Sequence, residues 1–330
     1  MQAKGIERRM IGRGGIEVTR LGVGLWAIGG IASNYAWGPV DDRESLRMID
    51  AAVDAGVTLF DNSDSYGLGH SEELQGQAMK GRRDRFVVCT KIGWGGWDSA
   101  RNCSAYDTVD KVVAGVENNL RRLQTDHIDI LLSHINFRDP TMETMVEGFQ
   151  KLQEQGKIRA YGVSTSDLDY LKAFNADGRC AVLLTDYSVL NRTPEAALLP
   201  YCQAEGISVI ARGPLAMGIL TGKFTAETRF PQNDFRHNWH DKPDEHAIFL
   251  QDLAKVERLR PLAQGRTLAQ LALQFVLAHP AITAAVPGAK FAAQVQENMG
   301  AAYLPPLTAE DWSALDAITP PGGGRAIWPA

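Results

Sequence analysis

Two hydrophobic patterns alternate along this chain: short apolar runs, and longer stretches in which apolar positions recur every three or four residues. Short runs that are apolar on both faces are typical of parallel strands covered by helices. Such runs predict strands at residues 21–24, 59–61, 86–90, 128–132, 160–164, 182–185, 208–211 and 284–286. The helical spacing predicts helices at residues 45–55, 72–79, 108–123, 142–155, 167–173, 194–205, 268–278 and 292–301.

These strand and helix patterns alternate along the whole chain, with no long linker rich in Pro, Gly or Ser between them. Eight right-handed βα units close most simply into a (β/α)8 barrel, and an open doubly wound sheet is the competing closure. We therefore predict one α/β domain over residues 1–330, a (β/α)8 TIM barrel with a C-terminal helical tail.

Two segments lie outside this repeat. Residues 9–18 contain short alternating runs around a glycine-rich turn, which predicts an N-terminal β-hairpin at the N-terminal mouth of the barrel. Residues 230–246 are polar and contain Pro231 and Pro243, so we expect a long loop after the seventh strand. Loops on that side of a barrel shape the active site, so we expect this loop near it.

Composition and charge narrow the class of protein. The 330 residues include 34 Lys+Arg and 39 Asp+Glu, a formal net charge of −5, and 45% are hydrophobic. These proportions are typical of a globular chain with a large core, and they argue against a nucleic-acid partner. The charged N-terminus, the lack of a long apolar stretch and four scattered cysteines predict a cytoplasmic protein with no membrane partner, of unknown oligomeric state.

The ends of the predicted strands carry ionisable side chains, and in a barrel such ends form the active site. They are Asp61, Lys91 and His134, and Tyr66 follows in the turn after the first of them. We expect the ammonium of Lys91 to lower the pKa of the Tyr66 phenol, and Asp61 to keep Lys91 charged. His134 is expected to donate a hydrogen bond to a substrate carbonyl. Together these groups would protonate a carbonyl oxygen while a hydride reaches its carbon.

Several segments resemble the aldo-keto reductases, in the order and at the spacing of that family. They are FDNSDSYG (60–67), GHSEELQGQAM (69–79), VVCTKIG (87–93), IDILLSH (128–134), GKIRAYGVST (156–165) and AAVPGAKFAAQVQEN (284–298). The resemblance implies a (β/α)8 barrel that binds NADP(H) and reduces an aldehyde or ketone, or oxidises the corresponding alcohol or sugar. It implies a catalytic tetrad, with the tyrosine as general acid or base: Asp61, Tyr66, Lys91 and His134.

The resemblance also implies a set of cofactor and substrate contacts. The implied cofactor residues are Gly24, Leu25, Trp26 and Asp61 near the nicotinamide ribose, Ser164 and Thr165 at the carboxamide, Arg212 on the nicotinamide ring, Gly213, Pro214, Leu215, Gly218 and Lys223 around the pyrophosphate, and Gly288, Ala289, Lys290, Gln294, Glu297 and Asn298 at the adenosine. The implied substrate contacts are Trp26, Tyr66, Trp94 and His134. Glycine amides of the pyrophosphate loop are expected to be free to bind phosphate oxygens.

The chain departs from the family pattern at two of these places. Leu184 stands where the family usually has a Gln that bonds the carboxamide, so one bond to nicotinamide is expected to be missing. Gln294 stands where many NADP-specific members have Arg, whereas Lys290 is suited to a 2′-phosphate. We therefore expect NADP(H) as cofactor, with NAD(H) also possible. Ser164 and Thr165 can alternatively cap the helix that follows them.

Other functions and motifs compete with this interpretation. A barrel aldolase would use Lys91 to form a Schiff base, although Asp61 disfavours the free amine. A nucleotide-binding redox sensor or regulatory subunit would bind the cofactor with little turnover. The Gly22-x-Gly24-x-x-Ala27 motif matches a loose Rossmann fingerprint, but Gly29 and Pro39 interrupt the helix that it requires. A polar cluster lacks the helical spacing of metal ligands, so we expect no metal there: His237, His240, Asp241, Asp244 and His246.

Overall fold

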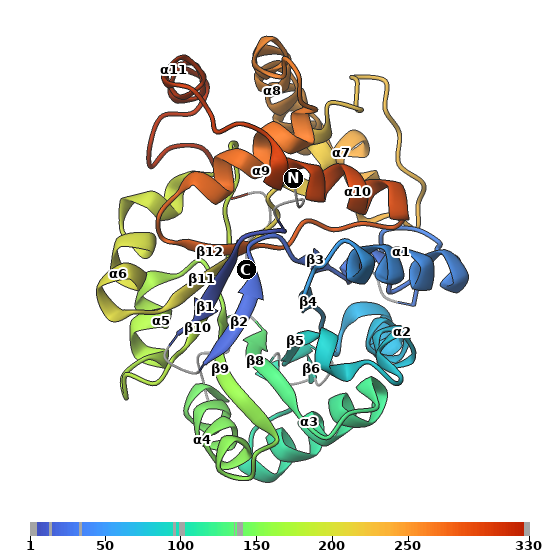
Figure 1. The fold of residues 1–330 in the computed structure, drawn as a ribbon, viewed down its shortest axis with the longest axis vertical. Coiled ribbons are helices and arrows are strands. Elements are labelled where there is room, and N and C mark those ends of the chain that lie inside the picture. The colour runs from blue at the N-terminus through green and yellow to red at the C-terminus, as the bar shows by residue number, and fades with distance from the viewer. Residues whose placement is uncertain are drawn as a thin grey trace.

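Eight parallel strands form a barrel in the computed structural model, which describes residues 5–12, 15–32, 35–94, 97–98, 103–134, 136 and 141–326 (Figure 1). From neighbour to neighbour the strands are β3 (Val23–Gly24), β4 (Leu59–Asp61), β5 (Val87–Ile92), β8 (Ile128–His134), β9 (Ile158–Ser164), β10 (Val182–Asp186), β11 (Ser208–Arg212) and β12 (Ile282–Ala285). Two parallel bridges, Leu21 to Ala285 and Gly24 to Gly288, join the first strand to the last. The predicted (β/α)8 TIM barrel is therefore confirmed, and the open sheet is excluded.

Helices surround the barrel and connect its strands (Figure 1). They are α1 (Asp42–Asp54), α2 (His70–Met79), α3 (Val109–Leu123), α4 (Thr141–Glu154), α5 (Leu168–Phe174), α6 (Leu198–Glu205), α9 (Leu268–Ala278) and α10 (Ala292–Gly300). All eight lie where the hydrophobic spacing predicts them, although the predicted helix at residues 194–205 begins with a separate 3-10 turn, η5 (Thr193–Ala196).

Helix α3 shows why these segments are helical. Thr108 caps its N-terminus, because Thr108 Oγ1 accepts a hydrogen bond from Lys111 N at 3.3 Å. Residues three or four positions apart form one buried stripe, which includes Val112, Val116 and Leu123. The helix therefore packs this stripe against the sheet and leaves its polar side chains toward solvent.

The predicted hairpin at residues 9–18 is formed by β1 (Arg8–Ile11) and β2 (Ile16–Thr19), which pair in antiparallel register. Its buried side chains extend the apolar cluster inside the barrel: Ile11, Ile16 and Val18 pack with residues such as Leu59, Cys89, Ile130, Leu184 and Ile210. The N–H of Gly12 donates to Ser208 Oγ at 2.7 Å, at the start of β11. The hairpin therefore covers the N-terminal mouth, so the functional face is the opposite one.

Residues 230–246 differ from the long loop that their polarity predicts. Most of this segment is helical: η7 (Phe235–His237), α7 (Asn238–Asp241) and the start of α8 (Pro243–Leu259). Asp234 caps the first turn, since its Oδ1 accepts from Arg236 N at 3.0 Å. Pro243 lies in the first turn of α8, where its missing N–H costs nothing. The prediction was wrong because polar residues that cap and solvate short helices have the composition of a loop.

The C-terminal part of the chain is helical, as predicted. Helix α11 (Ala309–Ile318) is capped by Thr308, whose Oγ1 accepts from Asp311 N at 3.1 Å. Figure 1 shows α8 and α11 outside α9, in the orange and red part of the chain. Within the part of the chain that the structure describes, every helix is too short or too polar to cross a membrane.

Candidate functional site

A cavity of about 990 Å³ lies at the C-terminal ends of the strands. This is the upper end of the usual range for small-molecule sites, roughly 300–1,000 Å³. Its wall includes residues at or just after six strand ends and one residue after the last strand: Gly24, Asp61, Lys91, His134, Ser164, Arg212 and Gly288. Parallel strands of a barrel all end on one face, which is why residues so distant in sequence share one cavity.

The four residues of the expected tetrad meet at one side of this cavity, around the ammonium of Lys91. Lys91 Nζ donates to Asp61 Oδ1 at 2.8 Å, to the backbone oxygen of Asn62 at 2.7 Å and to Tyr66 OH at 3.0 Å. Lys91 is 1% exposed. All three hydrogens of the ammonium are therefore used, and Tyr66 keeps its own O–H hydrogen for a donation into the cavity.

Burial changes the protonation expected from sequence. Burial raises the pKa of Tyr66, the charge of Lys91 opposes this, and the net pKa lies above its ordinary value. The expectation that Lys91 lowers the pKa of this phenol overall is therefore wrong, because loss of hydration outweighs the nearby ammonium. Burial by itself lowers the pKa of Lys91, but Asp61 and Tyr66 outweigh it and raise the pKa above its ordinary value. The resting pair is thus a neutral phenol beside an ammonium.

His134 lies at the end of β8 and faces the same cavity. Its ring stands edge-on to the rings of Tyr66 and Trp94, with centroid distances of 6.1 Å and 6.4 Å. Burial first, and then the positive charges of Lys91 and Arg212, hold the pKa of His134 well below its ordinary value. The imidazole is therefore neutral and carries one N–H.

A buried polar network behind the tetrad was not predicted from the sequence. Glu72 on α2 accepts a hydrogen bond from Thr90 Oγ1 at 2.5 Å and one from Arg122 Nε at 2.7 Å. Asn119 Nδ2 donates to the backbone oxygen of Lys91 at 3.3 Å. Burial raises the pKa of Glu72 to about 7, and Arg122 opposes this rise. The network ties the strand that carries Lys91 to two covering helices.

Most residues expected to contact a cofactor lie on the cavity wall. They are Gly24, Trp26, Asp61, Ser164, Arg212, Gly213, Pro214, Leu215, Gly218, Lys223, Gly288, Ala289, Lys290, Gln294, Glu297 and Asn298. The substrate residues Trp26, Tyr66, Trp94 and His134 line it too. A cavity that runs from the tetrad to the start of α10, with cationic side chains along it, fits an elongated anionic dinucleotide.

Two of the expected contacts, Leu25 and Thr165, do not line the cavity, and both are fully buried. The N–H of Leu25 donates to Asp61 O at 2.8 Å, which joins the ends of two neighbouring strands. Thr165 Oγ1 donates to Asn136 Oδ1, and its N–H donates to Leu184 O at 3.1 Å. The side chain of Leu184 belongs to the apolar cluster inside the barrel. These residues support the wall from behind.

The loop after β11 has an unusual backbone. Gly213, Ala216, Met217 and Gly218 all have positive φ, at 60°, 48°, 55° and 91°. The N–H of Gly218 donates to Leu215 O at 3.0 Å, so this amide is not free for phosphate as expected. Gly218 instead keeps the loop narrow where it borders the cavity.

A bridge of two segments, residues 36–38 and 233–236, borders the cavity. The N–H of Phe235 donates to Ala36 O at 2.9 Å, and the N–H of Gly38 donates to Asn233 O at 3.1 Å. Arg236 pairs with Asp234 at 2.6 Å, donates to Met217 O at 3.1 Å and lies 4.5 Å from the ring of Trp37. The sequence analysis missed this bridge, because its partners lie about two hundred residues apart and share no motif.

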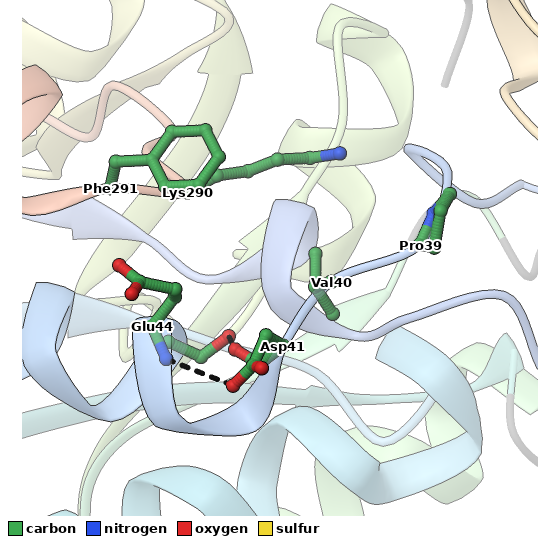
Figure 2. Close-up of a pocket in the computed structure, with 7 residues that line it drawn as sticks. Pro39, Val40, Asp41, Glu44, Lys290 and Phe291 are labelled. Atoms are coloured by element: carbon green, nitrogen blue, oxygen red, sulfur yellow. Dashed lines mark hydrogen bonds between the residues drawn. The ribbon is translucent and has the colours of Figure 1, made fainter.

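The far end of the cavity is built around Lys290, which also lines a second cavity of about 310 Å³. Figure 2 shows the extended side chain of Lys290 on one side of this smaller cavity, with Asp41 and Glu44 on the other. Lys290 Nζ donates to Trp37 O. Gln294 Oε1 accepts from the N–H of Lys290 at 2.7 Å, so this side chain is engaged in capping α10.

A metal centre is not part of this geometry. Within the described residues, no group of three or more His, Cys, Asp or Glu side chains is placed to hold a metal ion. His240 and His246, from the cluster considered above, form an edge-on ring pair with centroids 4.5 Å apart. The side chains of Trp97, at the edge of the expected substrate region, and of Phe137 lie outside the described residues.

Comparisons with known proteins agree with one another. The model of the Aldo/keto reductase family matches residues 20–320. Aldo-keto reductase YhdN of Bacillus subtilis (strain 168) is 35% identical over 291 residues, which cover 86% of this chain and 84% of that protein. The NADH-specific methylglyoxal reductase of Escherichia coli (strain K12) is 32% identical over 313 residues, which cover 88% and 92%.

Solved structures are similar over nearly their full length. The glycerol dehydrogenase AKR11B4 from Gluconobacter oxydans superposes with a TM-score of 0.80 at 32% identity, covering 94% of each chain. An aldo/keto reductase from Klebsiella pneumoniae in complex with NADP and acetate superposes with a TM-score of 0.70 at 29% identity, covering 97% of this chain and 99% of that one. The barrel and its functional face therefore have counterparts in structures of this kind.

Proposed function

The chain belongs to the aldo/keto reductase family of NAD(P)H-dependent oxidoreductases, and from this premise we propose an NADP(H)-dependent enzyme that uses Tyr66 as its general acid. In this proposal it reduces an aldehyde or ketone, or oxidises the corresponding alcohol or sugar. The observation that carries the proposal is the 3.0 Å hydrogen bond from Lys91 Nζ to Tyr66 OH, beside a cavity large enough for cofactor and substrate.

The reaction follows from the protonation states around Tyr66. When bound, the reduced nicotinamide supplies a hydride, which forms the new C–H bond at the carbonyl carbon. Tyr66 donates its O–H proton to the carbonyl oxygen, which becomes the alcohol. The phenolate that is left is stabilised by the ammonium of Lys91, which Asp61 holds charged at 2.8 Å. In the reverse direction the phenolate takes the proton of the alcohol.

Several side chains would hold the cofactor in this proposal. Ser164 suits the carboxamide, Arg212 the face of the nicotinamide ring, Lys223 the pyrophosphate and Lys290 the 2′-phosphate. Lys223 Nζ lies 4.0 Å from Glu297 Oε2, so residues expected at opposite ends of the dinucleotide approach each other around the cavity. The cavity can then close around its ligand from two sides.

The preference for NADP(H) over NAD(H) rests on Lys290. A lysine at this position can neutralise a 2′-phosphate, but Asp41 and Glu44 line the adjoining cavity and oppose a second negative charge (Figure 2). Similar proteins include one whose name states NADH specificity and one solved with NADP. We therefore propose NADP(H) as the preferred cofactor and NAD(H) as a weaker alternative.

The aldolase alternative loses its chemical basis in this geometry. A Schiff base requires a free amine, whereas Lys91 donates three hydrogen bonds and Asp61 raises its pKa. A redox sensor with little turnover differs from the enzyme in rate alone.

Consumption of NADPH and NADH against a panel of aldehydes, ketones and sugars tests the proposal. We expect multiple turnovers with at least one substrate class, and faster turnover with NADPH. Tight cofactor binding without turnover on any member of the panel would favour the sensor.

A further inference from the structure

Ser63 lies directly behind the imidazole of His134 and is fully buried. Its Oγ is 2.9 Å from His134 Nδ1 and 3.1 Å from Asp64 Oδ1. Ser63 Oγ also accepts from the N–H of Ser65 at 3.2 Å and contacts Ser65 Oγ at 3.0 Å. A serine hydroxyl has one hydrogen to donate, so only one of these neighbours receives it.

The hydrogen of Ser63 goes to Asp64. A carboxylate is the strongest acceptor within reach, and it has no hydrogen to give back. The other oxygen of Asp64 accepts from the N–H of Gly93 and from Tyr106 OH, both at 3.4 Å, so the carboxylate acts as an acceptor on both sides. Ser63 Oγ therefore presents lone pairs to everything except Asp64.

This arrangement decides which nitrogen of His134 carries the hydrogen. A bare Nδ1 would point its lone pair at a lone pair of Ser63 Oγ across 2.9 Å, which is repulsive. A hydrogen on Nδ1 turns the same contact into a hydrogen bond. Because His134 is neutral and has a single N–H, Nε2 keeps its lone pair. No partner for Nε2 is found within the described residues, and the ring lines the cavity.

We propose that Ser63, oriented by Asp64, holds His134 as the Nδ1–H tautomer, so that His134 Nε2 accepts a hydrogen bond from the substrate. This reverses the donor role expected from sequence. It rests on the proposed function for the identity of the ligand as a carbonyl compound. Ser63 is a positioning residue in this account, since it acts on the substrate through the imidazole.

The substrate class follows from the two groups that face it. Tyr66 donates to the carbonyl oxygen, and His134 accepts from a second group close by, since the two rings are only 6.1 Å apart between centroids. A hydroxyl on the carbon next to the carbonyl satisfies both. The preferred substrates are therefore 2-hydroxy aldehydes or 2-hydroxy ketones. The hydroxyl keeps its proton throughout, while the carbonyl carbon gains the hydride and the carbonyl oxygen gains the proton of Tyr66.

The tautomer can be measured without any turnover. In the full-length protein labelled with ¹⁵N-histidine, the signals of His134 are identified by their loss in His134→Gln. We expect chemical shifts of an Nδ1–H tautomer in the wild type, and a shift toward Nε2–H in Ser63→Ala. Ser133→Ala is the matched control, because Ser133 Oγ is buried without a partner in the described part of the chain. An Nε2–H tautomer in the wild type would overturn the proposal even if Ser63→Ala does not fold.

The substrate class is tested with pairs that differ by one hydroxyl, such as glycolaldehyde against acetaldehyde. We expect kcat/KM of the wild type to favour the hydroxylated member by at least about tenfold, the value of one good hydrogen bond. Ser63→Ala should lose most of this ratio, and Ser133→Ala should keep it. A wild-type ratio near one would overturn the substrate assignment. Absence of any carbonyl reduction would instead refute the proposed function, and the tautomer measurement would still decide the role of Ser63.

Discussion

The tetrad end and the adenosine end of the cavity are built in different ways. At the tetrad end, Lys91 is 1% exposed and all of its hydrogens are bonded to groups at the strand ends. At the adenosine end, Lys290 and Glu297 lie at or in α10, and Lys223 has a 62% exposed side chain. The comparison shows that groups that move protons are held by the barrel itself. Groups that hold a ligand lie on surface elements that a bridge of backbone hydrogen bonds brings together.

The largest expected effect lies at the tetrad end. Tyr66→Phe removes the proton donor and should reduce kcat by roughly 10²–10⁴-fold, the usual contribution of a general acid. Binding of NADPH, followed by fluorescence titration, should change little because the cofactor contacts remain. If this variant reduced carbonyl compounds at the wild-type rate, Tyr66 would not be the acid.

The polar network behind the tetrad should make stability depend on pH. The pKa of Glu72 is about 7 in the folded protein against an ordinary value of 4.5, so the folded state binds the proton more tightly. Its contribution is fully present below pH 4.5 and is lost as the pH rises to about 7. The free energy of unfolding should fall by about 3 kcal/mol across this window.

Urea unfolding at several pH values measures that fall, and Glu72→Gln should remove it. Glu73→Gln is the matched control, because Glu73 is the next residue on the same helix and its side chain is 55% exposed. An identical pH dependence in the wild type and in Glu72→Gln would show that the carboxyl titrates alike in folded and unfolded chains.

At the adenosine end, Lys290→Ala should discriminate between the two cofactors. Loss of one charge-assisted contact should weaken NADPH by about 1.5–3 kcal/mol, or roughly ten- to a hundredfold, and NADH only slightly. Lys223→Ala should weaken both cofactors alike, since it is expected at the pyrophosphate. Equal losses for NADPH and NADH in Lys290→Ala would remove the assignment of the 2′-phosphate.

The smallest expected effect concerns the bridge at residues 36–38 and 233–236. Arg236→Ala removes the ion pair with Asp234 and the hydrogen bond to Met217 O. We expect NADPH to dissociate faster, by up to about tenfold, with little change in the association rate. Stopped-flow fluorescence measures both rates, and Arg229→Ala on the same segment is the control. An unchanged dissociation rate would show that the bridge does not retain the cofactor.

Local pattern was sufficient for much of this protein and insufficient at identifiable places. The strands and their end residues were predicted, because hydrophobic spacing and strand ends are local properties. The helical turns at residues 235–246 were missed, because capping by Asp234 depends on a single side chain in a polar stretch. The direction of the pKa shift of Tyr66 was predicted wrongly, because burial is not a property of a motif.

The sequence by itself determined the order of strands and helices, the family, and the tetrad residues to be examined, since each depends on residues close together in the chain. The tertiary structure decided how those residues are partnered. The contact of Ser63 with His134 spans 71 positions, and that of Lys290 with Trp37 spans 253. The physical reason is that hydrogen-bond direction and loss of hydration depend on which groups fold against one another, and barrel closure sets this across the whole chain.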